Sequence, residues 1–251
     1  MIACVLGLGA VLRVGHFGDS TCITSYLPDE ARVHRALERK LEGAFRGLDV
    51  VSHNFARGGD FVYRFLNREG DWGPKWGRGE GPKPGRYWTE IRGRAKLDIA
   101  LIRYGQNDMK QYEPAEFRER LKELVAQIKA DFPSVLVVLE TGTYFDPAHY
   151  GWAGINRKFD GYWQVTRELA KELRLPLVDN FRRWEEETRK GNWDLRIRRD
   201  GTLDASKDAG REREKSWFAN GHPNARGVEL IADEELNVIR QLLVKGASGR
   251  R

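Results

Sequence analysis

The segment Val11-Leu-Arg-Val-Gly-His-Phe-Gly-Asp-Ser-Thr-Cys22 is an apolar run that stops at Gly18-Asp19-Ser20. This pattern is typical of a buried strand that delivers a small hydroxyl residue to a tight turn. Serine is a poor nucleophile until a neighbouring base takes its proton. If Ser20 is a nucleophile, the rest of the chain has to supply a base and N–H donors that can hold an oxyanion.

Three further blocks offer such groups. Each is weak alone, because a Gly-Asp-Ser tripeptide is usually a turn, an Asn usually caps a loop, and a lone His is usually structural. Their order along the chain makes them informative, since two follow predicted strands and the last precedes a predicted helix. The blocks are Gly58-Gly59-Asp60 after Leu48–Asn54, Gly105-Gln-Asn107-Asp108 after Leu97–Tyr104, and Gly221-His222-Pro-Asn224.

Together with Ser20, these blocks resemble the Ser, Gly, Asn and His blocks of the SGNH hydrolases, also called GDSL-type esterases. The resemblance spans about Val11 to Leu243. It implies ester hydrolysis without a metal or organic cofactor, with Ser20 as the nucleophile and His222 as the base. It also implies an oxyanion hole made of the backbone N–H groups of Ser20 and Gly59 and the side-chain amide of Asn107. Gly59 is preferred over Gly58 because its spacing from Asn54 fits the family block better.

The chain departs from the family at the acid that orients the histidine. That acid usually lies three residues before the histidine, where this sequence has Ala219, and the nearby Asn220 carries no charge. Three explanations stay open. A backbone carbonyl orients His222 in a Ser–His dyad, the site is impaired, or an acid reaches in from the preceding loop, with the candidates Asp200, Asp204, Asp208 and Glu214.

Composition indicates a globular chain of one domain, residues 1–251, with 40% hydrophobic and 32% charged residues. No apolar run approaches the roughly 20 residues that span a bilayer. Residues 1–10 resemble the tail of a secretion signal without its charged start, and we favour an exported protein on this basis. The two cysteines give no disulfide framework, and Cys22 is expected to be a small packing residue.

The formal net charge of +6 predicts a solvated basic surface, with a denser patch at Arg196–Arg199. The alternative is attraction to an acidic polymer such as a uronate-bearing polysaccharide or nucleic acid. No nucleic-acid-binding motif is present, so we expect a small-molecule or polysaccharide ester as the partner and no nucleic acid.

Strand and helix patterns alternate along the chain, which predicts an α/β fold with a mostly parallel five-stranded sheet and helices on both faces. The resemblance implies the same three-layer α/β/α sandwich, of flavodoxin-like type. Expected strands are 11–17, 48–52, 97–103, 134–140 and 175–178. Expected helices are 29–45, 61–66, 87–95, 114–131, 159–173, 181–190 and a last one capped by Asn224.

Two stretches, 68–87 and 141–158, break this alternation and are expected to be loop insertions near the catalytic edge. They contain aromatic residues that could stack on sugar rings or pack as lids over the sheet: Trp72, Trp76, Tyr144, Phe145, His149, Tyr150 and Trp152. A third stretch, 191–216, is charged and expected to be irregular and exposed.

The leading hypothesis is a serine esterase that works through an acyl-enzyme, with O-acetyl groups on carbohydrate as the favoured substrate. The alternatives are a lysophospholipase or thioesterase, a sugar O-acyltransferase, and a non-catalytic glycan-binding relic. Acidic and basic residues near the blocks are expected to be structural: Asp19 and Asp108 shape turns, Asp179 caps a helix, and His16 and His53 have no catalytic role.

Overall fold

The computed structural model describes residues 10–67, 85–93, 96–145, 154–192, 194–198 and 219–248. Five parallel strands form one sheet in the order β2-β1-β3-β4-β5, which confirms the predicted fold class. This order is that of flavodoxin-like folds. The strands are β1 (Ala10–Gly18), β2 (Leu48–Asn54), β3 (Ile99–Arg103), β4 (Leu136–Glu140) and β5 (Leu177–Val178).

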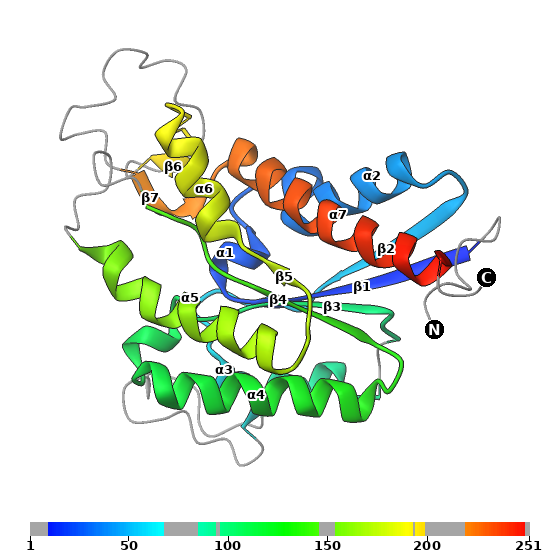
Figure 1. Cartoon of the computed structure of the whole chain (residues 1–251), viewed down its shortest axis with the longest axis horizontal. Coiled ribbons are helices and arrows are strands. Elements are labelled where there is room, and N and C mark those ends of the chain that lie inside the picture. The colour runs from blue at the N-terminus through cyan, green and yellow to red at the C-terminus, as the bar shows by residue number, and fades with distance from the viewer. Residues whose placement is uncertain are drawn as a thin grey trace.

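Helices cover both faces of this sheet (Figure 1). One face packs against α3 (Val62–Leu66), α4 (Pro114–Asp131) and α5 (Ile155–Glu172). The other packs against α2 (Val33–Ala44), α6 (Asn180–Arg189) and α7 (Ala225–Ser248). The central strand β3 is buried along its whole length, as expected for a parallel strand covered on both sides.

Helix α4 shows why the apolar spacing was informative. Pro114 stands in its first turn, where a missing N–H costs nothing, and the stripe predicted from Phe117 to Ile128 faces the core.

The predicted caps are also present. Asp179 accepts from the backbone N–H of Arg182 at the start of α6, and Asn224 accepts from that of Gly227 in α7.

The predicted helix over 29–45 was wrong in one respect, because it is interrupted at Arg32. A 3₁₀ turn, η2 (Asp29–Ala31), comes first, and α2 starts only at Val33. Arg32 is extended, with ψ 155°, and its guanidinium bonds the Leu27 carbonyl. This bond from the Arg32 side chain stabilises the break between η2 and α2. The helix predicted over 87–95 is shorter than expected. The structure has a single π-helical turn there, η3 (Tyr87–Ile91).

The prediction that 191–216 is irregular and exposed holds for Gly191 and Asn192, which are exposed, but it was wrong from Leu195 onward where the structure describes it. Residues Arg196–Arg198 form β6, which pairs antiparallel with β7 (Ala219–Pro223). Leu195 and Ile197 are buried, and so is Arg196, which is 5% exposed. Its guanidinium lies over the rings of Phe145 and Trp184, so Arg196 does not belong to a solvated basic patch. Residues 193 and 199–218 lie outside the described residues.

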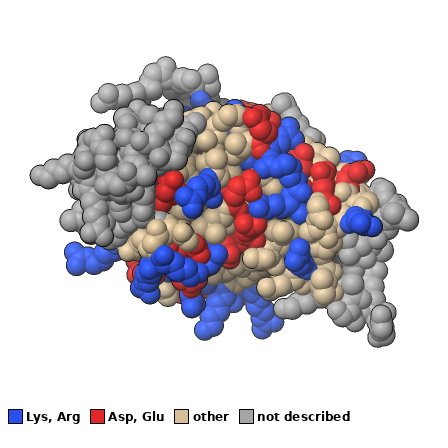
Figure 2. All heavy atoms as spheres, turned by 90° about the horizontal axis from the view of Figure 1, so that it is seen from above, with Lys and Arg blue, Asp and Glu red and all other residues tan. Residues whose placement is uncertain are grey.

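The surface seen from above mixes both signs of charge, with Lys and Arg next to Asp and Glu (Figure 2). Ion pairs join α2 and α7 on this face, where Lys40 of α2 pairs with Glu229 and Asp233 of α7. On this face the structure supports the solvated-surface interpretation. Within the described parts of the chain, no helix combines the length and apolarity that crossing a membrane requires.

Candidate active site

Three of the four sequence blocks follow neighbouring strands. Ser20 comes just after β1, Gly59 after β2 and Asn107 after β3, and β1 lies between the other two in the sheet. The carboxyl ends of parallel strands share one edge, which is where ligands bind in open α/β sheets. The topology therefore brings these three loops together at one edge.

The fourth block joins them through a direct contact. Nε2 of His222 lies 2.8 Å from Oγ of Ser20, although the two residues are 202 positions apart. Both residues are partly exposed, so a substrate can reach them. Hydrogen-bonding distance between a hydroxyl and an imidazole is the geometry that a nucleophile and its base require.

The backbone on both sides of His222 is held by buried or half-buried side chains. Arg196 donates from a guanidinium nitrogen to the Gly221 carbonyl at 2.7 Å. The Tyr26 hydroxyl donates to the Pro223 carbonyl at 2.7 Å, and its ring packs edge-on against the imidazole, with centroids 5.4 Å apart. The imidazole is thus positioned by contacts from β6 and from the segment after β1.

Ser20 begins α1 (Ser20–Ile23), a single turn whose cap is Asp19. The Asp19 carboxylate accepts from the backbone N–H of Thr21 at 2.8 Å and from its hydroxyl at 2.7 Å, which confirms that Asp19 shapes this turn. Thr24 ends the turn in a left-handed conformation with φ 47°. These local bonds fix the backbone that carries Ser20.

The other candidate oxyanion donors come from the loops after β2 and β3, at the same edge of the sheet as Ser20. Gly59 has φ +75°, a conformation that glycine adopts without strain, and a Cβ added at Gly58 would lie 4.0 Å from that of Ser20. Asn107 is 7% exposed, and its Nδ2 donates to the Asp60 carbonyl at 3.1 Å. Its Oδ1 accepts from Nζ of Lys110 at 3.1 Å, so the orientation of the amide is set at both atoms.

Asp108 connects the two loops that carry the Gly and Asn blocks. One carboxylate oxygen accepts from the backbone N–H of Val62 at 3.0 Å, and the other accepts from that of Gly105 at 2.9 Å. Its predicted role in shaping a turn is confirmed, but the bond to Val62 reaches 46 residues along the chain. Burial raises the pKa of Asp108 to about 7.

Electrostatics at the site favour a neutral imidazole. Burial lowers the pKa of His222 from its ordinary value, and the positive charges of Arg196 and Lys110 lower it further. A neutral imidazole can accept the serine proton at neutral pH. The four acids proposed to orient this ring, at positions 200, 204, 208 and 214, lie outside the described residues.

Sequence analysis missed Tyr26, Lys110 and Arg196. Tyr26 and Arg196 bond backbone carbonyls far along the chain, so no local motif marks them. Lys110 lies three residues after Asn107 and bonds its amide oxygen, which the spacing of the block could have indicated. Two further histidines, His16 and His53, have the structural character expected of them. His16 is fully buried within β1, and His53 stacks on Phe55 with ring centroids 5.5 Å apart.

The sugar-stacking role suggested for loop aromatics was wrong for Phe145. This side chain is 2% exposed and stacks on Phe159, with ring centroids 5.3 Å apart. It is buried because it lies between α5 and the Arg196 guanidinium. Tyr144 packs edge-on against Phe181. The other aromatics of that proposal, at 72, 76, 149, 150 and 152, lie outside the described residues.

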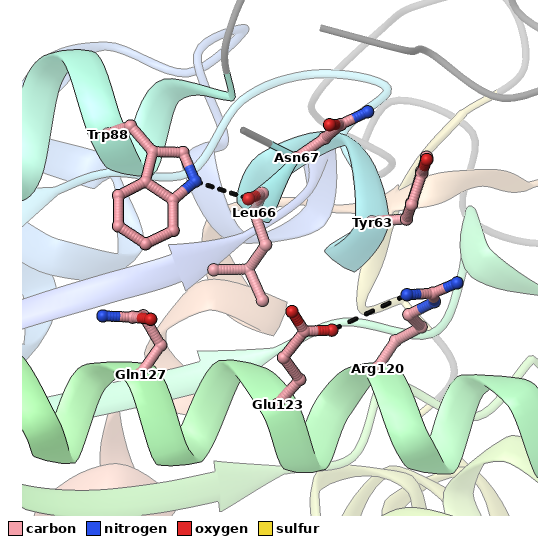
Figure 3. A pocket seen from close by; sticks show the side chains of 7 residues that line it. All are labelled: Tyr63, Leu66, Asn67, Trp88, Arg120, Glu123 and Gln127. Carbon is pink, nitrogen blue, oxygen red and sulfur yellow. Dashed lines mark hydrogen bonds and ion pairs between the residues drawn. The ribbon is translucent and has the colours of Figure 1, made fainter. Parts of the chain in front are cut away.

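A pocket of about 320 Å³ opens between α4 and the segment formed by α3 and η3 (Figure 3). None of the four candidate site residues lines it. Its aromatic walls already contact polar groups, since the Arg120 guanidinium lies 4.8 Å from the Tyr63 ring centroid and the Trp88 indole N–H donates to the Leu66 carbonyl. Among the described residues, no group of three or more His, Cys, Asp or Glu is placed to hold a metal ion.

Comparisons with known proteins agree with this geometry. The model of the GDSL-like lipase/acylhydrolase family matches residues 16–230. Solved structures with a similar fold include Axe2, an acetylxylan esterase from Geobacillus stearothermophilus, with 18% identity, a TM-score of 0.61 and coverage of 94% of this chain and 96% of that one. No curated protein matches the sequence.

Two further structures show the same fold. A member of the lipolytic G-D-S-L family from Veillonella parvula is 15% identical, with a TM-score of 0.59 and coverage of 92% of this chain and 99% of that one. LAE5, an alpha/beta hydrolase enzyme from the metagenome of Lake Arreo, is 20% identical, with a TM-score of 0.60 and coverage of 94% and 99%.

Proposed function

Since the chain belongs to the GDSL-like lipase/acylhydrolase family and is a carboxylic ester hydrolase, we propose that it cleaves its ester through an acyl-enzyme on Ser20. The observation that supports this most directly is the 2.8 Å separation of Ser20 Oγ and His222 Nε2. At this distance the imidazole can take the serine proton directly. No rearrangement of either backbone is needed before attack.

In the first half-reaction, His222 Nε2 takes the proton of Ser20 Oγ, which attacks the carbonyl carbon of the ester. The carbonyl oxygen becomes an oxyanion, held by the backbone N–H groups of Ser20 and Gly59 and by the amide of Asn107. When the tetrahedral intermediate collapses, the imidazolium returns the proton to the leaving alcohol. The acyl group remains on Oγ.

In the second half-reaction, water replaces the alcohol. His222 takes a proton from the water, the hydroxide attacks the acyl carbon, and the same donors hold the second oxyanion. Collapse releases the carboxylic acid, and the proton on His222 returns to Ser20 Oγ. Donors already in place stabilise the transition state without reorganisation, which is the main source of acceleration in such sites.

The bonds from Arg196 and Tyr26 hold the Gly221 and Pro223 carbonyls on both sides of His222, which supports a site in which these side chains help to orient the histidine. Losing the orienting acid of such a triad costs less activity than losing the serine or the histidine, because the base and the oxyanion hole still act. We therefore propose that the serine and histidine are competent without an acid at position 219.

We further propose O-acetylated carbohydrate as the substrate. Support comes from the shared fold with Axe2, which is an acetylxylan esterase. A panel of acetylated sugars and acyl esters of rising chain length tests this choice. We expect hydrolysis to fall with acyl length, whereas preference for long acyl chains would favour a lysophospholipase or thioesterase. Ser20→Ala should abolish hydrolysis of every ester, and unchanged hydrolysis in that variant would reject Ser20 as the nucleophile.

A further inference from the structure

Arg103, the last residue of β3, reaches from the core to the turn that carries Ser20. Its side chain is 2% exposed. One guanidinium nitrogen donates to the backbone carbonyl of Thr21 at 3.2 Å, and Thr21 directly follows the serine. The other terminal nitrogen lies 3.3 Å from a carboxylate oxygen of Glu140, at the end of the neighbouring strand β4.

Two more buried side chains complete this cluster. Asn180, at the start of α6, donates to the same Glu140 oxygen at 3.3 Å. Glu235 of α7 is 0% exposed and interacts electrostatically with Glu140 and Arg103. Burial, then the charge of Glu140, raises the pKa of Glu235 well above its ordinary value. Arg103 thus pairs directly with Glu140, and Glu235 is buried beside this pair.

Such a cluster is poorly explained by stability alone. Removing charged groups from water is costly, and well-packed apolar side chains of similar volume often stabilise a core as well or better. The cluster does, however, have a directed contact with the catalytic turn. Helix α1 has only four residues, so its geometry depends on partners outside it. Asp19 holds the Thr21 N–H while Arg103 holds the Thr21 carbonyl.

Packing makes the contact rigid. A Cβ added at Gly18 would lie 2.6 Å from the Arg103 carbonyl oxygen and 2.7 Å from Cβ of Cys22. The catalytic turn thus rests directly on the end of β3. A displacement of about 1 Å at a reacting group can cost roughly 100-fold in rate, so small movements of this turn matter.

We infer that Arg103 is a positioning residue, held by Glu140 and Glu235, which fixes the turn after β1 so that Ser20 Oγ stays within reach of His222 Nε2. The inference rests on the proposed function, because it assumes that Ser20 is the nucleophile. It adds a buried charge cluster, drawn from β3, β4 and α7, to the elements on which the reaction depends.

Arg103→Met and Arg103→Lys test this role. We expect kcat for p-nitrophenyl acetate to fall by about tenfold or more in Arg103→Met, with KM changed far less. The rate of Ser20 phosphonylation by a fluorophosphonate should fall in parallel. Arg103→Lys keeps the charge but not the forked geometry, so we expect a folded protein with an intermediate loss in both rates.

The matched control is Arg167→Met. Arg167 makes a two-point ion pair with Asp179 after β5, three strands from β1, on the order of 14 Å across the sheet. We expect this variant to lose stability but keep kcat and the labelling rate. Wild-type kcat and labelling in folded Arg103→Met or Arg103→Lys, or equal losses of kcat in Arg167→Met, would overturn the inference.

Failure of the proposed function would be visible separately, as hydrolysis or labelling that persists in Ser20→Ala. If Ser20→Ala is inactive and unlabelled while the Arg103 variants match the wild type, only the positioning role fails. If Arg103→Met does not fold, Arg103→Lys decides between the two outcomes, because it retains the buried charge.

Discussion

The side-chain amide of Asn107 donates to the backbone carbonyl of Asp60 across 3.1 Å, which ties the loop after β3 to the loop after β2. Lys110 holds the amide oxygen from the other side. A primary amide has two N–H groups, so one remains for the oxyanion. These two bonds set the orientation of the amide that we propose as an oxyanion donor.

Asn107→Ala should therefore lower kcat by about 10²–10³-fold, the usual cost of one oxyanion donor, with a much smaller change in KM. Steady-state kinetics with p-nitrophenyl acetate measures both constants. A rise in KM at unchanged kcat would mean that Asn107 binds the ground state and does not serve the transition state.

Lys110 also affects the pH dependence of the reaction. The pKa of His222 is lowered by burial and by the charges of Arg196 and Lys110. The imidazole therefore stays neutral until the pH falls below the ordinary pKa of histidine. We expect the acidic limb of kcat/KM to lie below about pH 6.5. Lys110→Met removes one positive charge and should move that limb to higher pH.

Lys122→Met is the matched control for this shift, because Lys122 pairs with Glu172 between α4 and α5. It should leave the pH profile where it is in the wild type. An acidic limb above pH 6.5 in the wild type, or a downward shift in Lys110→Met, would contradict the assignment of His222 as the base.

Tyr26→Phe tests whether the backbone contacts of His222 matter for the reaction. The variant keeps the ring but loses the bond to the Pro223 carbonyl, so we expect kcat to fall several-fold and stability by about 0.5–1.5 kcal/mol. Tyr162→Phe loses a similar bond, to the Tyr112 carbonyl, and should cost stability without reducing kcat. Equal kcat in the two variants would exclude a role for Tyr26.

Asp108→Ala should be the most destabilising of these substitutions. It leaves the buried N–H groups of Val62 and Gly105 without their acceptor, at about 1–3 kcal/mol each. Urea unfolding followed by circular dichroism measures the loss. A change in the free energy of unfolding below about 0.5 kcal/mol would mean that these N–H groups find other partners.

The sequence predicted the sheet and the convergence of three blocks well, because both depend on local patterns. Strand β3 is apolar throughout, α4 has an apolar stripe and a proline in its first turn, and strand ends in a parallel sheet share an edge. The break at Arg32 could not be predicted, since it depends on a bond from that guanidinium to the Leu27 carbonyl that helical spacing does not encode.

The supports of the site were missed for the same reason. Arg196 resembles one more charge in a basic run, yet it is buried against Phe145 and Trp184. Arg103 is one charged residue in an apolar strand, and the Thr21 carbonyl that it bonds lies 82 positions away. Such pairings depend on tertiary contacts between elements, whereas motifs report only on neighbours in sequence.

The central claim is that Ser20 carries the acyl group, and mass spectrometry of the protein treated with a fluorophosphonate tests it most directly. The account predicts one adduct per chain, located by peptide mapping at Ser20, with loss of esterase activity in proportion to labelling. Ser20→Ala should show neither adduct nor activity. An adduct at another residue, or full esterase activity in Ser20→Ala, would contradict the account.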